Sequence, residues 1–197
     1  MKSENRAEGA AVGQPVEPSP VKLIMAVILA QSVSVPEVRT QIEASYGAID
    51  LSSAMLPFDA THYYEREMGP HLHRMLWSFQ TLISPEALAE IKRATNALER
   101  AFACWDGRSR RRRVNLDPGY VDLAKLVLAT TKDRQHRLYL GQGIYAEVTL
   151  RFTGGHFIPW EWTYPDYRSP EYLTFFEAVR RCYRQQQTAR LAEARHV

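Results

Sequence analysis

The alternation of apolar and polar residues divides the chain into strands and amphipathic helices. The first element is nearly all apolar, as in a strand that is buried on both faces of a sheet. Further runs of strand length follow it. The predicted strands of this first part are Val21–Ala30, Ile49–Phe58, Met75–Ile83 and the short Val114–Leu116.

Two helices are predicted between these strands, because apolar residues recur there every three or four positions. The first helix follows Ser34, whose side chain is a candidate N-terminal cap, and ends at Gly47. The second follows Ser84, and its apolar stripe consists of Leu88, Ile91, Leu98, Phe102 and Trp105. The resulting βαββαβ order is typical of the ferredoxin-like fold.

A hairpin is predicted after the apolar run Leu126–Thr131. In His136–Phe152, on both sides of the central Gly141-Gln142-Gly143, the even positions from Leu138 onward are apolar and the odd positions are polar or aromatic. A three-residue loop, with Gly143 in the left-handed region, keeps the two faces separate. This register gives two favourable cross-strand pairs, Tyr139 with Tyr145 and Arg137 with Glu147.

We therefore expect one α+β domain over residues 21–184. It has a ferredoxin-like βαββαβ core with an antiparallel sheet, extended by a β-hairpin unit and a C-terminal helix that begins near Ser169. Residues 1–20 contain almost nothing to bury, which predicts a disordered N-terminal tail. Residues 185–197 are predicted to form a polar C-terminal tail.

The composition is that of an ordinary globular protein, with 45% apolar and 24% charged residues in 197. The net charge of +3 is too small to indicate nucleic-acid binding by itself. Two cysteines without a CxxC motif favour a reducing compartment, and no apolar run is long enough to span a bilayer. We expect a cytoplasmic protein that does not bind membranes.

Several motifs together resemble an uncharacterised bacterial family, domain of unknown function 4416, over roughly Pro20 to Tyr183. They are Thr61-His62-Tyr63-Tyr64-Glu65-Arg66-Glu67-Met68-Gly69, Val114-Asn115-Leu116-Asp117-Pro118-Gly119-Tyr120, Ala129-Thr130-Thr131-Lys132-Asp133, His136-Arg137-Leu138-Tyr139-Leu140, Gly143-Ile144-Tyr145-Ala146-Glu147-Val148-Thr149-Leu150 and Trp162-Thr163-Tyr164-Pro165-Asp166-Tyr167. The resemblance implies no established activity. Its members sometimes carry a GTP-binding label, but this chain has no GxxxxGK[ST] loop.

The richest concentration of polar residues runs from Asn115 to Glu147, and it predicts a site for a phosphate- or carboxylate-bearing small molecule. Lys132 and Arg137 are candidate clamps for the anion, and His136, oriented by Asp133, is a candidate acid or base if the site turns its ligand over. Further ligand-binding candidates are Tyr139, Tyr145, Thr149 and Tyr164. Three carboxylates would hold Mg²⁺ if they converge, and these are Asp117, Glu147 and Asp166.

Each of these residues also has a structural interpretation. Asp117-Pro118-Gly119 is typical of a turn, which Asp117 would cap through its own backbone. Arg137 would then merely form an ion pair with Glu147. The sheet face that carries Tyr139, Tyr145 and Thr149 would be the solvent side of the sheet.

Two other clusters of polar residues also have alternative interpretations. His62, His71 and His73 suggest zinc, but there is no HExxH motif, so surface histidines are the favoured interpretation. The basic stretch Arg108–Arg113 could bind RNA, which makes an RNA-binding or protein-interaction module the alternative function, or it could be a solvated loop. A purely structural or regulatory protein is the third hypothesis.

Overall fold

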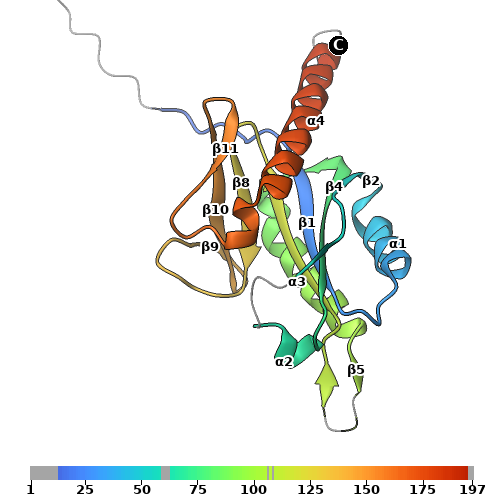
Figure 1. The fold of residues 1–197 in the computed structure, drawn as a ribbon. Helices are drawn as coiled ribbons and strands as arrows, with labels where there is room; N and C mark the ends of the chain where they lie inside the picture. The colour runs from blue at the N-terminus through green and yellow to red at the C-terminus, as the bar shows by residue number, and fades with distance from the viewer. Residues whose placement is uncertain (1–12, 59–62, 106, 108, 195–197) are drawn as a thin grey trace, which may run out of the picture.

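The structure is a computed structural model, and it describes residues 13–58, 63–105, 107 and 109–194. The chain combines helices with an antiparallel sheet, which confirms the predicted α+β class (Figure 1). The predicted βαββαβ order is present between residues 21 and 121, where, among the described residues, three additional two-residue strands and one additional short helix lie between its members.

Within the described residues the main sheet has nine strands, and all of its pairs are antiparallel. Its order is β11-β10-β8-β7-β1-β4-β2, while β3 pairs with β4 and β9 pairs with β10. A separate small hairpin joins β5 to β6. The strands are β1 Val21–Leu29, β2 Ile49–Ser52, β3 Leu56–Pro57, β4 His73–Ile83, β5 Cys104–Trp105, β6 Arg110–Arg111, β7 Val114–Val121, β8 Lys125–Thr130, β9 Leu138–Gly141, β10 Ile144–Thr153 and β11 His156–Pro159.

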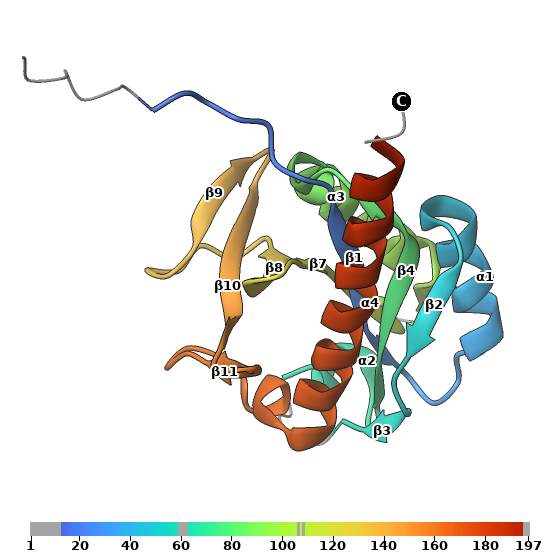
Figure 2. The ribbon, with the colours of Figure 1, turned by 90° about the horizontal axis from the view of Figure 1, so that it is seen from above.

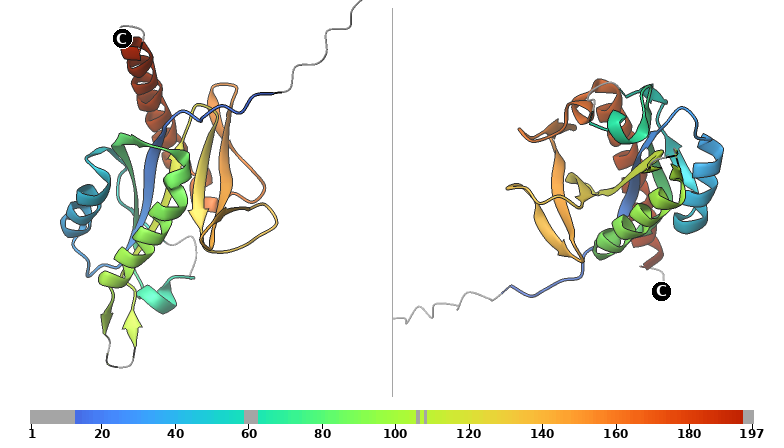
Figure 3. Two further views of the ribbon diagram at one scale, coloured as in Figure 1. Left: turned by 180° about the vertical axis from the view of Figure 1, so that it is seen from behind. Right: turned by 90° about the horizontal axis from the view of Figure 1, so that it is seen from below.

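Helices cover both faces of the sheet around β1 (Figures 2 and 3). The longer helices are α1 Val35–Tyr46, α3 Leu88–Ala101 and α4 Pro170–Ala194, and α2 is the short Glu65–Met68. Two 3₁₀ turns, Pro85–Ala87 and Pro165–Arg168, precede α3 and α4. Helices α1 and α3 pack on the face of β1 that carries Met25, whereas α4 packs on the face that carries Ala26. Every residue of β1 is buried, as the sequence predicted.

One of the buried residues of β1 is a lysine. Lys22 is fully buried, and its Nζ donates hydrogen bonds to the Asp50 carboxylate at 2.6 Å, the Phe79 carbonyl at 2.8 Å and the Gln186 Oε1 at 3.0 Å. A buried ammonium is tolerated only when it is paired and fully hydrogen-bonded. These contacts therefore fasten α4 to β1 and to the edge of the sheet.

Some predicted elements differ from the observed ones. The strand expected over Ile49–Phe58 is divided into β2 and β3. Ser34 makes no capping hydrogen bond through its side chain, although Ser84 accepts one from the Glu86 amide. Trp105 does not belong to the buried stripe of α3, because the helix ends at Ala101 and Trp105 lies 69% exposed in β5.

The turn predicted at Asp117-Pro118-Gly119 is wrong, because these residues lie inside β7. Each of them pairs with a residue of β1. Proline and glycine together are a strong local signal for a turn, but the long-range pairing with β1 overrides it here.

The register of the β9–β10 hairpin was predicted correctly, with Tyr139 opposite Tyr145 and their rings 5.2 Å apart. The loop is shorter than expected. Gly141 pairs with Ile144 around a two-residue turn, in which Gln142 and Gly143 both have positive φ, and a register shift follows. The two-residue turn and the register shift together give the same pairing of Tyr139 with Tyr145 that a three-residue loop would give.

The ends of the domain are tied together. Residues 1–12 of the predicted N-terminal tail lie outside the described residues, and 13–19 have no regular secondary structure. The boundary expected at residue 184 falls within α4, where Gln187 donates a hydrogen bond to the Pro20 carbonyl at 2.8 Å. Among the described helices, none combines the length and the apolar character needed to cross a bilayer.

Candidate functional site

The site begins where strands β7 and β8 separate. They pair between Gly119–Val121 and Leu126–Leu128, and along the preceding part of β7 no strand of the described residues occupies that edge. Side chains of α3 take the place of the missing strand. The Lys92 ammonium donates to the Leu116 carbonyl at 2.8 Å, and Glu99 accepts from the Leu116 amide at 2.7 Å. Pro118 lies two residues along the same edge, where its missing N–H leaves no donor unsatisfied.

Gly119 fixes the point where the two strands come together. A Cβ atom at this position would lie 2.3 Å from the Val127 carbonyl oxygen and 2.7 Å from Cδ2 of Leu128. Only glycine allows this approach, because any side chain would clash with backbone that cannot move away cheaply. The strands are therefore held tightly at Gly119 and diverge before it.

A cavity of about 700 Å³ occupies the space opened by this divergence. Its walls come from β1, β4, β7, β8, β10 and α3, and from the segments around residues 63–67 and 164–167. Ligand pockets in proteins commonly have this size.

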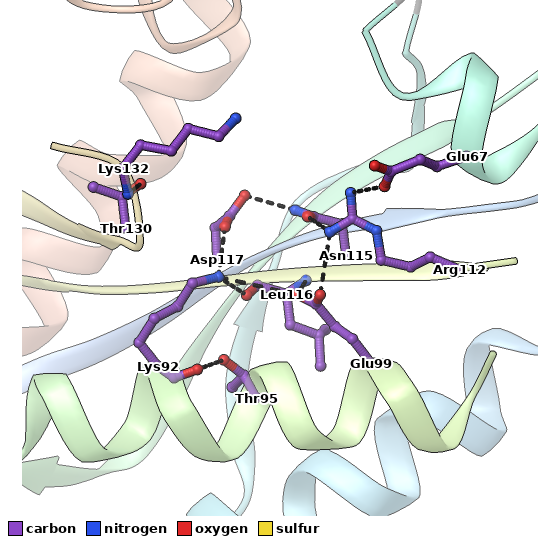
Figure 4. A network of polar contacts seen from close by, with 10 residues as sticks. All are labelled: Glu67, Lys92, Thr95, Glu99, Arg112, Asn115, Leu116, Asp117, Thr130 and Lys132. Atoms are coloured by element: carbon purple, nitrogen blue, oxygen red, sulfur yellow. Dashed lines mark hydrogen bonds and ion pairs between the residues drawn. The ribbon is translucent and has the colours of Figure 1, made fainter. Parts of the chain in front are cut away.

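The wall formed by α3 and β7 is a network of charged side chains (Figure 4). Asp117 accepts hydrogen bonds from Lys92 at 2.9 Å and from Asn115 at 2.6 Å. Arg112 donates to Asn115 at 2.8 Å and to Glu99 at 3.2 Å. A second Arg112 nitrogen reaches Glu67 at 2.7 Å, which ties α2 to this wall.

The two carboxylates of this wall respond differently to burial. Burial raises the pKa of Glu99, and the attraction of Lys92 and the Leu116 hydrogen bond offset this only in part. Burial also opposes ionisation of Asp117, but the ammonium and hydrogen bond of Lys92 and the hydrogen bond from Asn115 outweigh it, so that the pKa of Asp117 is lowered. Asp117 is therefore a carboxylate whose negative charge is balanced by the Lys92 ammonium.

The opposite wall is organised by Glu147 of β10. Its Oε2 accepts from Arg137 at 2.7 Å and contacts His136 Nε2 at 3.2 Å. Arg137 also donates to the Lys132 carbonyl at 2.8 Å and to the Tyr164 hydroxyl at 3.3 Å. These bonds join the segment after β8 to the loop before α4.

Arg74 of β4 lies at the third side of the cavity and is 5% exposed. It forms an ion pair with Asp166, and its guanidinium lies over the Tyr167 ring at 4.6 Å and over the Phe58 ring at 5.4 Å. A buried guanidinium that has only one carboxylate partner retains donor capacity, because it carries five N–H groups.

Three buried donors at this cavity have no hydrogen-bond partner among the described residues. They are Arg74 Nε, Arg112 Nε and the Tyr167 hydroxyl, and all three residues line the cavity. Tyr167 is 3% exposed. Buried donors are seldom left unpaired in native proteins, so such a group calls for an acceptor at the site.

Positive charge is in slight excess around the cavity. Six basic and five acidic side chains line it. Lys132 contacts the hydroxyl of Tyr63 at 2.9 Å and lies over its ring, and the Arg134 side chain has no ion pair within the described part of the chain. The unmatched cations lie on the exposed segment that follows β8.

The structure brings together about half of the residues proposed from the sequence. Those that line the cavity are Lys132, Arg137, Tyr164, Asp117, Glu147 and Asp166. Those that do not are Asp133, His136, Tyr139, Tyr145 and Thr149.

The acid–base pair expected from the sequence is not formed. Asp133 is exposed, and the carboxylate that contacts His136 belongs to Glu147. The His136 ring stacks on Trp162 at 5.2 Å, and Trp162 stacks on Trp160 at 5.1 Å. His136 therefore helps to hold Glu147 and the Trp162 loop in place.

The expected metal ligands each have a cation of the protein instead. Asp117 pairs with Lys92, Glu147 with Arg137, and Asp166 with Arg74. No group of three or more His, Cys, Asp or Glu side chains in the described residues is arranged to hold a metal ion. This applies to His71 and His73 as well, whereas His62 lies outside the described residues.

The basic stretch is less exposed than the sequence suggested. Arg110 and Arg111 are exposed in β6, but Arg112 belongs to the cavity wall and Arg113 donates to the Phe102 carbonyl at 3.2 Å. Arg108 lies outside the described residues. The stretch is therefore not a uniformly solvated loop.

With this geometry in view, comparison with known proteins identifies a family but no activity. A family model described as "Domain of unknown function (DUF4416)" matches residues 19–183. The chain belongs to the DUF4416 family. No curated protein and no solved structure matches it.

Sequence reasoning missed four residues that shape the cavity of this DUF4416 chain, namely Arg74, Lys92, Glu99 and Tyr167. Two of them carried a recognisable signal. Lys92 lies four residues after Leu88, and Glu99 lies four residues after the buried Thr95, so both fall on the inner side of α3. Charged residues within a buried helical stripe seldom lack a partner, and this pattern could have identified them.

Proposed function

We propose that the cavity between β7 and β8 binds a small molecule that carries a phosphate or carboxylate group. The observation that carries this proposal is the set of three unpartnered donors, Arg74 Nε, Arg112 Nε and the Tyr167 hydroxyl. Each such group costs about 1–3 kcal/mol when it is left without an acceptor. An oxyanion supplies several acceptor lone pairs at once, and guanidinium groups bind oxyanions well.

The charges around the opening support an anionic ligand. Lys132 and Arg134 have no carboxylate partner among the described residues, and both line the cavity. A concave site with an excess of one charge concentrates ligands of the opposite charge. The acidic residues of the walls do not oppose this, because each is matched by a lysine or arginine of the protein.

The proposal concerns binding and includes no metal ion. Asp117, Glu147 and Asp166 are engaged with separate cations, so a divalent ion would have to displace three ion pairs. We further propose a bacterial cytoplasmic protein with a ferredoxin-like core. The two cysteines are both free, which suits a reducing compartment, and such a core by itself selects no activity.

The test is thermal unfolding of the purified protein against a panel at constant ionic strength. The panel holds phosphate, sulfate, simple carboxylates, phosphorylated metabolites and short RNAs. A ligand at a hundred times its dissociation constant adds about 2.7 kcal/mol, which is roughly a 5–10 °C rise for a domain of this size. Tyr167→Phe should weaken that rise, and Arg181→Ala, which removes an exposed arginine of α4, should not.

A flat response to every small anion would contradict the proposal. If RNA alone stabilised the protein, in a salt-dependent manner, and if Arg110→Ala with Arg111→Ala removed the effect, the alternative of an RNA-binding module would replace it.

A further inference from the structure

A second hollow lies beside the cavity, on the outer side of α3. It has a volume of about 490 Å³ and lies between α3 and the β9–β10 turn at Gln142–Ile144. Asn96 and Thr131 line both this groove and the cavity, so the two are neighbours that share a border. No hydrogen bond of the Asn96 side chain is found within the described residues.

Helix α3 separates the two hollows, and its sequence explains how. Lys92, Asn96 and Glu99 face the cavity. The groove is lined by positions i, i+3, i+4 and i+7 from the same helix, namely Arg93, Asn96, Ala97 and Arg100. Residues with this spacing form one stripe of a helix. Asn96 lines both the cavity and the groove, and therefore lies at the border between them.

The groove carries positive charge that the fold does not use. Arg93 and Arg100 line it together with a single acidic residue, Glu90. Arg93 donates a hydrogen bond to the Gln142 side chain, which is neutral. Arg100 is exposed and has no carboxylate partner in the described parts of the chain. The two arginines are seven residues apart, so they span about 10 Å along the helix.

We propose that the ligand is elongated and carries a second anionic group, which lies in the groove against Arg93 and Arg100. This inference rests on the proposed function, since it requires a first anionic group in the cavity. The ligand would pass from Arg74 and Arg112 over the border at Asn96 to the outer side of α3. Two arginines with unused donors favour a phosphate or carboxylate at that end.

The experiment is calorimetric titration with paired probes of equal length. Alkylphosphonates carry one anionic end and α,ω-alkanediphosphonates carry two, and alkanoates and α,ω-dicarboxylates form a second pair of series. We expect the two-ended probe of the best length to bind about tenfold more tightly than its one-ended partner, because the second contact becomes intramolecular. The double variant Arg93→Ala with Arg100→Ala should abolish this preference and leave one-ended probes unaffected. Arg181→Ala is the matched control and should keep the preference.

The outcomes separate the two proposals. If one-ended probes bind and no two-ended probe gains affinity, or if the gain survives the double variant, the groove is not a second anion site and the inference is overturned. If no probe of either kind binds, the proposed function itself fails, and this inference fails with it.

Discussion

Glu99 accepts a hydrogen bond of 2.7 Å from the backbone amide of Leu116, so a helix side chain completes the edge of a strand. Lys92 donates a hydrogen bond to the carbonyl of the same residue, Leu116. The sheet can therefore open beside β7 without leaving its backbone unsatisfied. A cavity in the middle of a sheet is possible here because two charged side chains of α3 act as the missing neighbour.

The first prediction concerns this contact. Glu99→Leu leaves the Leu116 amide without an acceptor and removes one of the two carboxylate partners of Arg112. It should lower the free energy of unfolding by about 3 kcal/mol in urea denaturation. Glu99→Gln keeps an acceptor oxygen and should cost only about 1 kcal/mol. Burial raises the pKa of Glu99, which reflects the cost of desolvating its negative charge. The neutral glutamine side chain of the variant avoids this cost. Equal losses in both variants would refute the role of this hydrogen bond.

Tyr167→Phe should separate stability from binding. The Tyr167 hydroxyl is buried and has no partner in the described structure, so its removal should change the free energy of unfolding by less than about 0.5 kcal/mol, or increase it. Affinity for the anionic ligand should fall by roughly ten- to a hundredfold, which corresponds to the loss of one hydrogen bond to a charged group. A destabilised variant with unchanged affinity would show that the hydroxyl serves the fold.

The stability of the protein should depend on Asp117 in acid. The pKa of Asp117 is lowered from 3.8, so its stabilising contribution is present above pH 3.8 and is lost as the pH falls through the lower value in the folded state. Asp117→Asn should be less stable than the unmodified protein by about 2 kcal/mol at pH 7, because Lys92 loses the nearer of its two carboxylate partners. This difference should shrink below pH 3.8 when unfolding is followed from pH 7 to pH 2.5.

Asp133→Asn is the control for the acid experiment, because Asp133 is exposed and does not line the cavity. It should follow the unmodified protein at every pH. A difference between Asp117→Asn and the unmodified protein that stays constant down to pH 2.5 would argue against an ionised Asp117 in the fold.

Gly119→Ala should destabilise the domain by about 3 kcal/mol, since a Cβ atom would overlap the Val127 carbonyl where β7 meets β8. Gly13→Ala, at a position with nothing within 4 Å, should leave the melting temperature unchanged. If Gly119→Ala folds with unchanged stability, the two strands do not need this close approach to set the width of the cavity.

The sequence predicted those parts of the fold that depend on local patterns. A continuous apolar run identified β1 as a strand buried on both faces, and alternation over 17 positions set the register of Tyr139 against Tyr145. The register follows from the two-residue period of a strand, in which a one-residue error would move every side chain to the wrong face.

The features that local patterns missed depend on separate parts of the chain. Pro118 and Gly119 resemble a turn locally, and only the pairing of β7 with β1 makes them part of a strand. The contact of Glu99 with Leu116 crosses 17 positions, and the ion pair of Arg74 with Asp166 joins β4 to the turn before α4. The segments after β8 on which the sequence placed the candidate site do line the cavity. Arg74 and Lys92 line it too, but they were missed because they lie on β4 and α3, far from those segments in the sequence.

The buried lysine of β1 has a consequence for how the chain is made. Lys22 belongs to the first strand, Asp50 follows 28 positions later, and Gln186 lies 164 positions away near the end of α4. As the ribosome releases the chain, the Lys22 ammonium of β1 lacks one of its acceptors until Gln186 of α4 has emerged. The final packing of this domain is thus expected to await the synthesis of α4, so nascent chains that stop before residue 186 should remain sensitive to protease.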